Sequence, residues 1–283
     1  MPVARRLRRA LVALVAVAAV VPLAACDGPA GASTPTPQPA TYLALGDSVP
    51  FGFRAGADYS KAAAFVGYPQ LVGQKLGLRV VNATCPGETT ASFIDEKAQS
   101  NGCENSPRSP FGYRTGFPLH VLYDSVDQSQ LDYAVRTLQR TKNVSLVTVQ
   151  IGANDAFICQ HTTSDGCLSE IGTVAQTVQT NLGAILAKLR GDGGYRGRIV
   201  VVTYYAFDYA APEAGGIQTL DSAMAAAARA HGAVVASGFD AFRPVAEKSG
   251  GDSTAAGLVL PNDVHPTAAG QRLLAEAVEK AVG

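Results

Sequence analysis

The stretch Tyr42-Leu43-Ala44-Leu45-Gly46-Asp47-Ser48-Val49 begins with an apolar run and ends in a polar turn. The apolar run predicts a buried β-strand, so the turn places the Ser48 hydroxyl at the carboxyl end of a strand, where open α/β sheets hold their chemistry. A glycine at Gly46 permits a tight turn, and amides that follow a strand can point toward an anion. Ser48 is therefore the first candidate nucleophile. The alternative is that Asp47 and Ser48 only cap a following helix.

Three further polar segments lie where predicted elements end or begin. The strand-like run Val144–Ile151 is followed by Gly152-Ala153-Asn154-Asp155, and the run 78–83 is followed by a turn that contains Gly87. Asn262-Asp263-Val264-His265 stands just before a helical pattern. A serine hydroxyl, a glycine amide, an asparagine amide and a histidine ring, each at the end of an element, are the groups that acyl transfer requires.

Each residue type suits one part of that chemistry. A serine hydroxyl is a weak nucleophile until a base takes its proton, and an imidazole such as that of His265 titrates near neutral pH. Negative charge then gathers on the carbonyl oxygen, where Gly87 and Asn154 can donate hydrogen bonds without adding a titrating group. The simpler interpretations are a surface histidine before a helix for His265, a turn glycine for Gly87 and a helix cap for Asn154.

In their order along the chain, the segments with Ser48, Gly87, Asn154 and His265 resemble those of the SGNH (GDSL-type) hydrolase family. The resemblance covers essentially the whole chain from Thr41 to Gly283. The resemblance implies a flavodoxin-like three-layer α/β fold, with a parallel sheet flanked by helices. It implies that Ser48 is the nucleophile, that Gly87 and Asn154 stabilise the oxyanion together with the Ser48 amide, and that His265 is the general base. The expected function is that of a serine esterase or lipase, similar to secreted actinobacterial enzymes, that hydrolyses carboxylic esters through an acyl-enzyme and uses no cofactor or metal.

The segment around the histidine departs from the family pattern. The family usually has an aspartate three residues before the histidine, but this chain has Asn262 there and an aspartate, Asp263, one position later. Three arrangements are open: Asp263 contacts the imidazole, a backbone carbonyl does so in a Ser-His dyad, or Asn262 accepts the Nδ1 proton. Neighbouring residues of an extended segment face opposite ways, which favours the dyad or the Asn262 arrangement.

Strand-like and helix-like patterns alternate along the rest of the chain, and this alternation predicts a parallel sheet wrapped by helices. Two more strands are expected at 198–204 and 233–237. Helical spacing of apolar residues is seen at 65–76, 128–140, 171–189, 220–231 and 267–282. The irregular segment 95–124 contains Phe111, Tyr113, Phe117 and Tyr123, which either shape a substrate cleft or pack locally.

The N-terminus resembles a bacterial lipoprotein signal. Four arginines precede an apolar stretch, which ends in Leu23-Ala24-Ala25-Cys26. We expect residues 1–25 to be a signal peptide, residues 26–40 to be a lipidated cysteine and a flexible tether, and residues 41–283 to be the hydrolase domain. The expected location is extracytoplasmic, anchored to the membrane through Cys26. An ordinary secretory signal with a spare thiol is the alternative.

Charge and cysteine content agree with an exported enzyme. Loss of residues 1–25 removes four arginines and no acid, so 23 basic against 23 acidic side chains becomes 19 against 23, a net charge of about −4. No basic cluster remains in the body of the chain, which argues against a nucleic-acid partner, and we expect a monomer.

Four cysteines besides Cys26 predict two disulfides in an oxidising compartment, and we favour Cys85 with Cys103 and Cys159 with Cys167. Each of these bonds would close a loop beside a proposed catalytic segment. A zinc site is the alternative, but the chain has no Cys-x-x-Cys pair.

Two other functions are compatible with these features. A transacylase or O-acyl esterase that acts on cell-wall carbohydrate would share the whole site and differ in acceptor or substrate. A solute-binding lipoprotein would share the anchor and the α/β pattern, but would not need Ser48, Asn154 and His265 at element ends.

Overall fold

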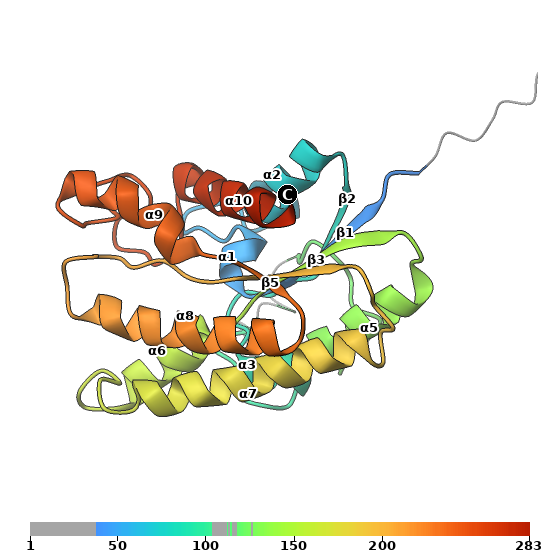
Figure 1. The fold of residues 1–283 in the computed structure, drawn as a ribbon, viewed down its shortest axis with the longest axis horizontal. Coiled ribbons are helices and arrows are strands. Elements are labelled where there is room, and N and C mark those ends of the chain that lie inside the picture. The colour runs from blue at the N-terminus through green and yellow to red at the C-terminus, as the bar shows by residue number, and fades with distance from the viewer. Residues whose placement is uncertain (1–37, 104–111, 113, 115–117, 126) are drawn as a thin grey trace, which may run out of the picture. The chain divides into compact units, whose positions relative to one another are not determined.

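Five parallel strands form the central sheet of the computed structural model, which describes residues 38–103, 112, 114, 118–125 and 127–283 (Figure 1). The strand order is β2-β1-β3-β4-β5. The strands are β1 (Thr41–Gly46), β2 (Arg79–Asn82), β3 (Val144–Gln150), β4 (Arg198–Val202) and β5 (Val234–Ala236). All were predicted from apolar runs, and the α/β class with helices on both faces is confirmed.

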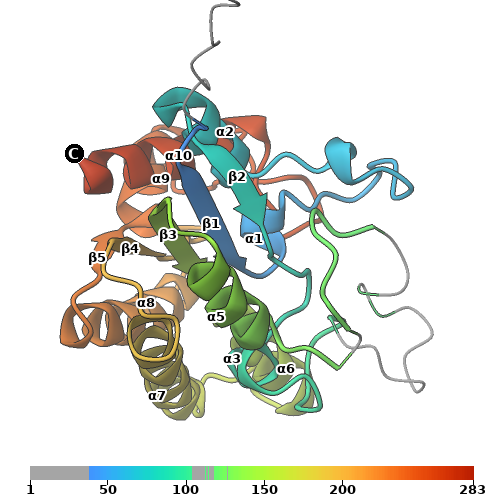
Figure 2. The ribbon, with the colours of Figure 1, turned by 90° about the vertical axis from the view of Figure 1, so that its right-hand side faces the viewer.

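Helices cover the two faces of this sheet, as Figures 1 and 2 show. One layer holds α2 (Tyr68–Leu76), α9 (Gly238–Ala246) and α10 (Ala268–Val282). The other layer holds α3 (Thr90–Ile94), α5 (Gln130–Arg140), α6 (Ala153–Thr162), α7 (Ile171–Arg190) and α8 (Glu213–Ala230). A short helix, α1 (Ser48–Phe51), directly follows β1, and two 3-10 turns lie at Ala62–Ala64 and Glu247–Ser249.

The helices with clear apolar periodicity were predicted, and those without it were missed. Helix α8 begins at Glu213, seven residues before the predicted start at 220, because its first two turns contain glycines and polar residues. Helix α6 follows directly on the Gly152 turn, and most of its residues are half-buried, so it lacks an apolar stripe. Helix α9 contains Pro244, a residue that normally argues against a helix interior.

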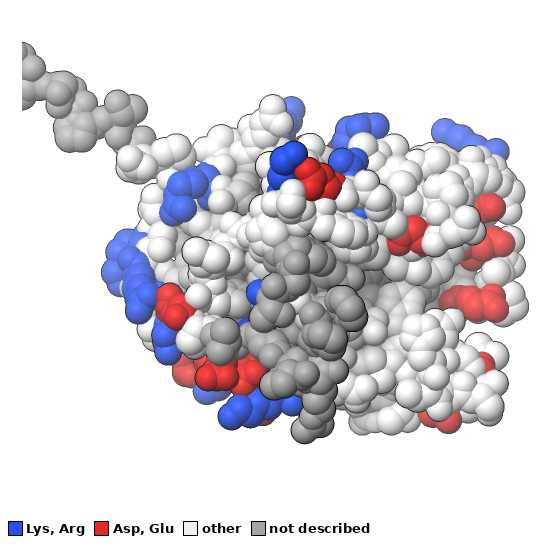
Figure 3. Space-filling view, turned by 180° about the vertical axis from the view of Figure 1, so that it is seen from behind, with Lys and Arg blue, Asp and Glu red and all other residues white. Residues whose placement is uncertain are grey.

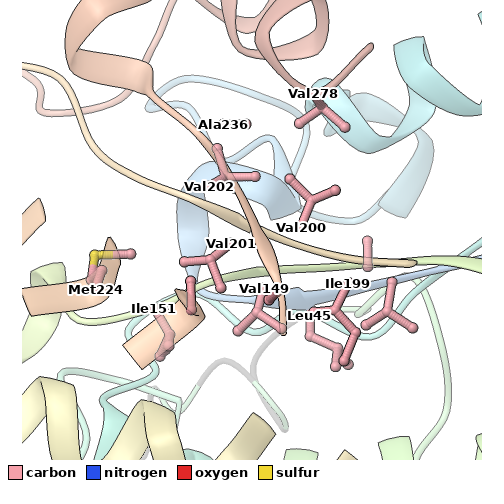
Figure 4. Packing of buried hydrophobic residues seen from close by; sticks show 14 of the residues in the cluster. Leu45, Val149, Ile151, Ile199, Val200, Val201, Val202, Met224, Ala236 and Val278 are labelled. Carbon is pink, nitrogen blue, oxygen red and sulfur yellow. The ribbon is translucent and has the colours of Figure 1, made fainter. Parts of the chain in front are cut away.

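Alternating strand residues join the sheet to both helical layers (Figure 4). On one side Val200 points toward Val278 of α10, and on the other side Val149 and Val201 point away from it. All four side chains are fully buried. Because both faces of the sheet are covered, its strands are almost continuously apolar, as is typical of parallel sheets.

The order in which the chain adds strands across the sheet changes direction between β1 and β3. From β1 the chain moves outward to β2, and it then crosses back to β3 on the other side of β1. Such a switch point leaves a crevice at the carboxyl ends of the two strands, where α/β proteins bind their ligands. Ser48 follows β1 and Asn154 follows β3 by only a few residues, so the fold places both at this end of the sheet.

The surface shows charges of both signs. On the face in Figure 3, basic and acidic side chains lie mostly toward the rim, while much of the described surface between them is uncharged. No helix among the described residues has both the length and the apolar character to cross a bilayer.

Candidate active site

Three side chains from two distant segments form a continuous hydrogen-bonded chain. His265 Nε2 lies 2.8 Å from Ser48 Oγ, and His265 Nδ1 lies 2.5 Å from Asp263 Oδ1. Ser48 is the first residue of α1, and His265 precedes α10. His265 is 9% exposed, and Ser48 is half-buried. The three groups have the order nucleophile, base and orienting acid that is found in serine hydrolases.

The preference for a dyad or for Asn262 is wrong, because Asp263 is the residue that contacts the imidazole. Asn262 is exposed and has φ 56°, which breaks the extended geometry on which the preference relied. The Asp263 amide donates to Leu260 O at 3.3 Å, which closes a turn with Pro261 and Asn262 at its centre. Proline followed by asparagine with positive φ is typical of a type II turn. This turn directs the Asp263 carboxylate back to the ring.

Asp263 accepts further hydrogen bonds that stabilise its charged form. Its Oδ2 accepts from the Ala55 amide at 3.2 Å, and its Oδ1 accepts from the Val264 amide at 2.7 Å. Partial burial alone would raise the pKa of Asp263, but His265 and the two amides outweigh burial and lower the pKa to about 2. Asp263 is therefore an anion throughout the neutral range.

The turn that holds Ser48 requires glycine at Gly46. Gly46 has φ 136°, and a Cβ added there would lie 2.0 Å from Gln150 O on the neighbouring strand. Gln130 of α5 fixes the same residue, since its Oε1 accepts from Gly46 N at 2.6 Å and its Nε2 donates to Gly46 O at 3.0 Å. Sequence reasoning missed Gln130, whose only signal is a polar residue on an otherwise apolar helix face.

Asp47 lies beneath the nucleophile as a buried acid. Its Oδ1 accepts from the Val49 amide at 3.0 Å, and its Oδ2 accepts from the Tyr204 hydroxyl at 2.5 Å. Burial raises the pKa of Asp47 to about 6, although the Tyr204 hydrogen bond lowers it in part. Asp47 thus caps α1, as the alternative interpretation of the turn proposed, while Ser48 remains directed toward His265.

Asn154 and Gly87 come from the segments that follow β3 and β2. Asn154 is 5% exposed; its Nδ2 donates to Glu88 O at 3.0 Å and its Oδ1 accepts from Asn101 Nδ2 at 2.9 Å. These bonds fix the orientation of the amide and use one of its two N–H groups. Among the described residues, no acceptor takes the amides of Ser48 or Gly87. Three N–H groups are therefore available for a bound oxygen.

Asn101 connects the two donors and was not predicted. Besides its bond to Asn154, its own amide donates to Gly87 O at 2.7 Å. Gly87 has φ 81°, and a Cβ there would approach Asn101 O to 2.4 Å, so the contact requires glycine. Nothing in the local pattern around Asn101 indicates this role, because both partners are distant or depend on backbone conformation.

Both predicted disulfides are confirmed. Cys85 is bonded to Cys103 and Cys159 to Cys167. The first bond closes the segment that carries Gly87 and Asn101, and the second closes the loop that follows α6. The alternative zinc site would need these sulfurs as free thiolates, so their pairing removes its ligands.

Of the four aromatic residues named in segment 95–124, the structure describes Tyr123. Tyr123 donates to Ala83 O at 2.6 Å and packs against Tyr133 at 5.0 Å between ring centroids, so it packs locally. Phe111, Tyr113 and Phe117 lie outside the described residues.

Comparisons with known proteins agree with this arrangement. Residues 44–273 match the model of the GDSL-like Lipase/Acylhydrolase family. Among solved structures, the chain is similar to an acetylxylan esterase, Axe2, from Geobacillus stearothermophilus, with 17% identity, TM-score 0.55, and coverage of 86% of this chain and 94% of that one. It is also similar to phospholipase A1 from Streptomyces albidoflavus NA297, with 19% identity, TM-score 0.55, and coverage of 86% and 100%. No curated protein sequence gives a significant match. Because the family model covers most of the chain, the protein belongs to the GDSL-like lipase/acylhydrolase (SGNH) family and is a carboxylic ester hydrolase.

Proposed function

We propose that the protein hydrolyses carboxylic esters through an acyl-enzyme on Ser48. The observation that carries this proposal is the chain of contacts from Ser48 Oγ to His265 Nε2 at 2.8 Å and from His265 Nδ1 to Asp263 Oδ1 at 2.5 Å. Asp263 holds the imidazole with Nδ1 protonated, which leaves Nε2 free to accept the hydroxyl proton.

The reaction has two matching halves. Ser48 Oγ bonds to the ester carbonyl carbon as its proton passes to His265 Nε2, and the bond to the alcohol oxygen breaks as Nε2 returns the proton to that oxygen. Water then attacks the acyl-enzyme as its proton passes to His265 Nε2, and the acid leaves when the bond to Ser48 Oγ breaks and Nε2 returns the proton to Oγ. Asp263 stabilises the imidazolium formed in each half.

The amides of Ser48 and Gly87 and the second N–H of Asn154 would bind the oxyanion. The support is that Ser48 and Asn154 line the same cavity, that Gly87 is linked to Asn154 through Asn101, and that the Asn154 amide is fixed by Glu88 and Asn101. Preorganised donors of this kind typically contribute about 3 to 4 kcal/mol each to transition-state stabilisation.

Ser48→Ala tests the nucleophile directly. We expect loss of p-nitrophenyl ester hydrolysis with unchanged thermal unfolding, and loss of covalent labelling by a serine-directed phosphonate. Ser60→Ala is the matched control, because Ser60 is an exposed serine of the following loop. Substantial turnover by Ser48→Ala would overturn the mechanism.

We also propose that the mature enzyme begins at Cys26 and is anchored outside the cytoplasm by a lipid on that residue. The support is the sequence Leu23-Ala24-Ala25-Cys26 after an apolar stretch, together with disulfides typical of oxidising compartments. Residues 1–37 lie outside the described part of the chain. Cys26→Ser should abolish partitioning of the protein into detergent, and unchanged partitioning would argue against the anchor.

A further inference from the structure

A small apolar cavity of about 60 Å³ lies directly against Ser48. Ser48 and Asn154, the nucleophile and one proposed oxyanion donor, contribute polar groups to its lining. The other walls come from the segments that follow β1 and β4 and from helices α6 and α8. They include Val49, Phe157, Tyr205, Phe207, Ile217 and Leu220.

A larger cavity of about 480 Å³ adjoins it, between α6, α8 and the loop closed by the Cys159–Cys167 bond. The two spaces share the walls formed by Ala156, Phe157, Phe207, Ile217 and Leu220. The second cavity extends along Ile171, Ala211, Ala214 and Leu168, the last of which is 65% exposed. The two adjoining cavities, called the groove below, extend from Ser48 to the exposed Leu168.

The groove is apolar along its length. Its charged lining residues beyond Asp47 are Asp208 and Glu213, and both are exposed, at the outer end. An unbranched hydrocarbon chain could occupy such a groove without leaving a buried polar group unpaired, whereas a sugar could not.

The position of His265 decides which half of the ester enters the groove. His265 must return a proton to the alcohol oxygen, so the alcohol must lie on the imidazole side of Ser48. That side is occupied by Phe53, whose ring centroid is 4.7 Å from that of His265. The imidazole is not among the described residues that line the groove. The acyl half therefore points away from His265, into the groove.

We propose that the groove between α6 and α8 binds the acyl chain, and that the preferred substrates are esters of straight-chain fatty acids longer than acetate. This inference rests on the proposed serine mechanism and adds the substrate class. An acetyl group would reach only the space next to Ser48, whereas a chain of eight to ten carbons would continue past Ile217 into the larger space.

A series of p-nitrophenyl esters from acetate to dodecanoate tests the proposal on the purified enzyme. Burial of each methylene is worth about a fourfold gain in kcat/KM, so decanoate should exceed acetate by at least about a hundredfold. Ile217→Trp, at the junction of the two spaces, should lower the decanoate-to-acetate ratio by about ten- to a hundredfold. Gln218→Trp, an exposed neighbour on α8, should leave the ratio unchanged.

The outcomes separate the two proposals. If no ester is hydrolysed, or if Ser48→Ala remains active, the serine mechanism fails. If the esters are hydrolysed but Ile217→Trp and Gln218→Trp give the same ratio as the parent enzyme, only the groove assignment fails.

A crystal structure of the Ser48 adduct with a decyl phosphonate provides a second readout. The alkyl chain should lie between Phe157 and Ile217, and a chain that runs past Phe53 would overturn the assignment.

Discussion

Asp263 and Asn262 are adjacent, yet only the Asp263 carboxylate contacts the imidazole. We expect Asp263→Asn to lower kcat by about four orders of magnitude, because an amide at this position can stabilise the wrong imidazole tautomer and cannot stabilise the imidazolium. With its NH2 group toward the imidazole, the amide oxygen takes the place of Oδ2 and still accepts from Ala55, so the loop should keep most of its shape. Steady-state kinetics on a short-chain ester provide the measurement.

Asn262→Gly is the matched control for that experiment. Glycine adopts the φ of 56° without strain and removes the side chain, so activity should stay within about twofold of the parent enzyme. A loss at Asn262→Gly comparable to that at Asp263→Asn would return Asn262 to the catalytic arrangement.

Asn101 is a positioning residue whose effect should pass through Asn154. We expect Asn101→Ala to lower kcat by about tenfold with little change in KM, because the Asn154 amide loses the bond that fixes its orientation. Asn154→Ala should cost about a hundred- to a thousandfold. A double-mutant cycle separates the roles: the double variant should be no worse than Asn154→Ala alone, and additive losses would contradict the coupling.

Helix α5 and strand β1 are tied together by one side chain. Gln130→Met keeps the length of the side chain but removes the acceptor of Gly46 N in a buried site and one of two donors to Gly46 O, which also accepts from the Cys85 amide at 3.1 Å. An unsatisfied buried group costs about 1 to 3 kcal/mol, so we expect the free energy of unfolding to fall by that amount, with a parallel loss of kcat. Gln139→Met, at an exposed position of the same helix, should cost less than about 1 kcal/mol in urea unfolding. Equal losses for the two variants would exclude the proposed tie.

The two disulfides should differ in function more than in stability. Their cysteines are 18 and 8 residues apart in sequence, and because loop-closure entropy depends only on the logarithm of loop length, it predicts a loss of about 3 kcal/mol for each. Replacement of Cys85 and Cys103 by alanine should lower kcat for all esters, since their loop holds Gly87 and Asn101. Replacement of Cys159 and Cys167 should mainly weaken activity on long-chain esters. Equal effects on both ester classes would contradict this division.

Elements with an uninterrupted local pattern could be predicted from the sequence, and those that depend on distant contacts could not. The inner strands β1, β3 and β4 were recognisable because both of their faces are buried, which makes them mostly apolar, while the partly exposed edge strands β2 and β5 were recognised from short valine-containing runs. The site segments were recognisable because each follows a strand or precedes a helix. The identity of the acid depended on the positive φ of Asn262, and the roles of Gln130 and Asn101 depended on partners 84 and 53 residues away. Such contacts leave no periodic signal.

At the scale of the whole molecule, several buried carboxyl groups make stability depend on pH. Burial raises the pKa of Asp221 on α8 to about 7, although the hydrogen bond from the Tyr204 amide opposes the shift, and burial raises that of Asp47 to about 6. The folded protein therefore binds more protons than the unfolded chain between about pH 4 and pH 7. Stability should fall as pH rises through this window and then level off.

Asp221→Asn isolates this effect away from the catalytic groups. The amide oxygen can still accept from the Tyr204 amide, as Asp221 Oδ1 does at 3.0 Å, and the neutral side chain has no charge to bury. We expect the variant to be more stable than the parent at pH 8 by a few kcal/mol, with little difference at pH 4, where the buried acid is protonated. Urea unfolding at both pH values measures the difference, and Glu276→Gln on the exposed face of α10 serves as the control. If Asp221→Asn were equally destabilising at both pH values, the carboxylate would serve as a structural anion, and the pH dependence would have to come from other groups.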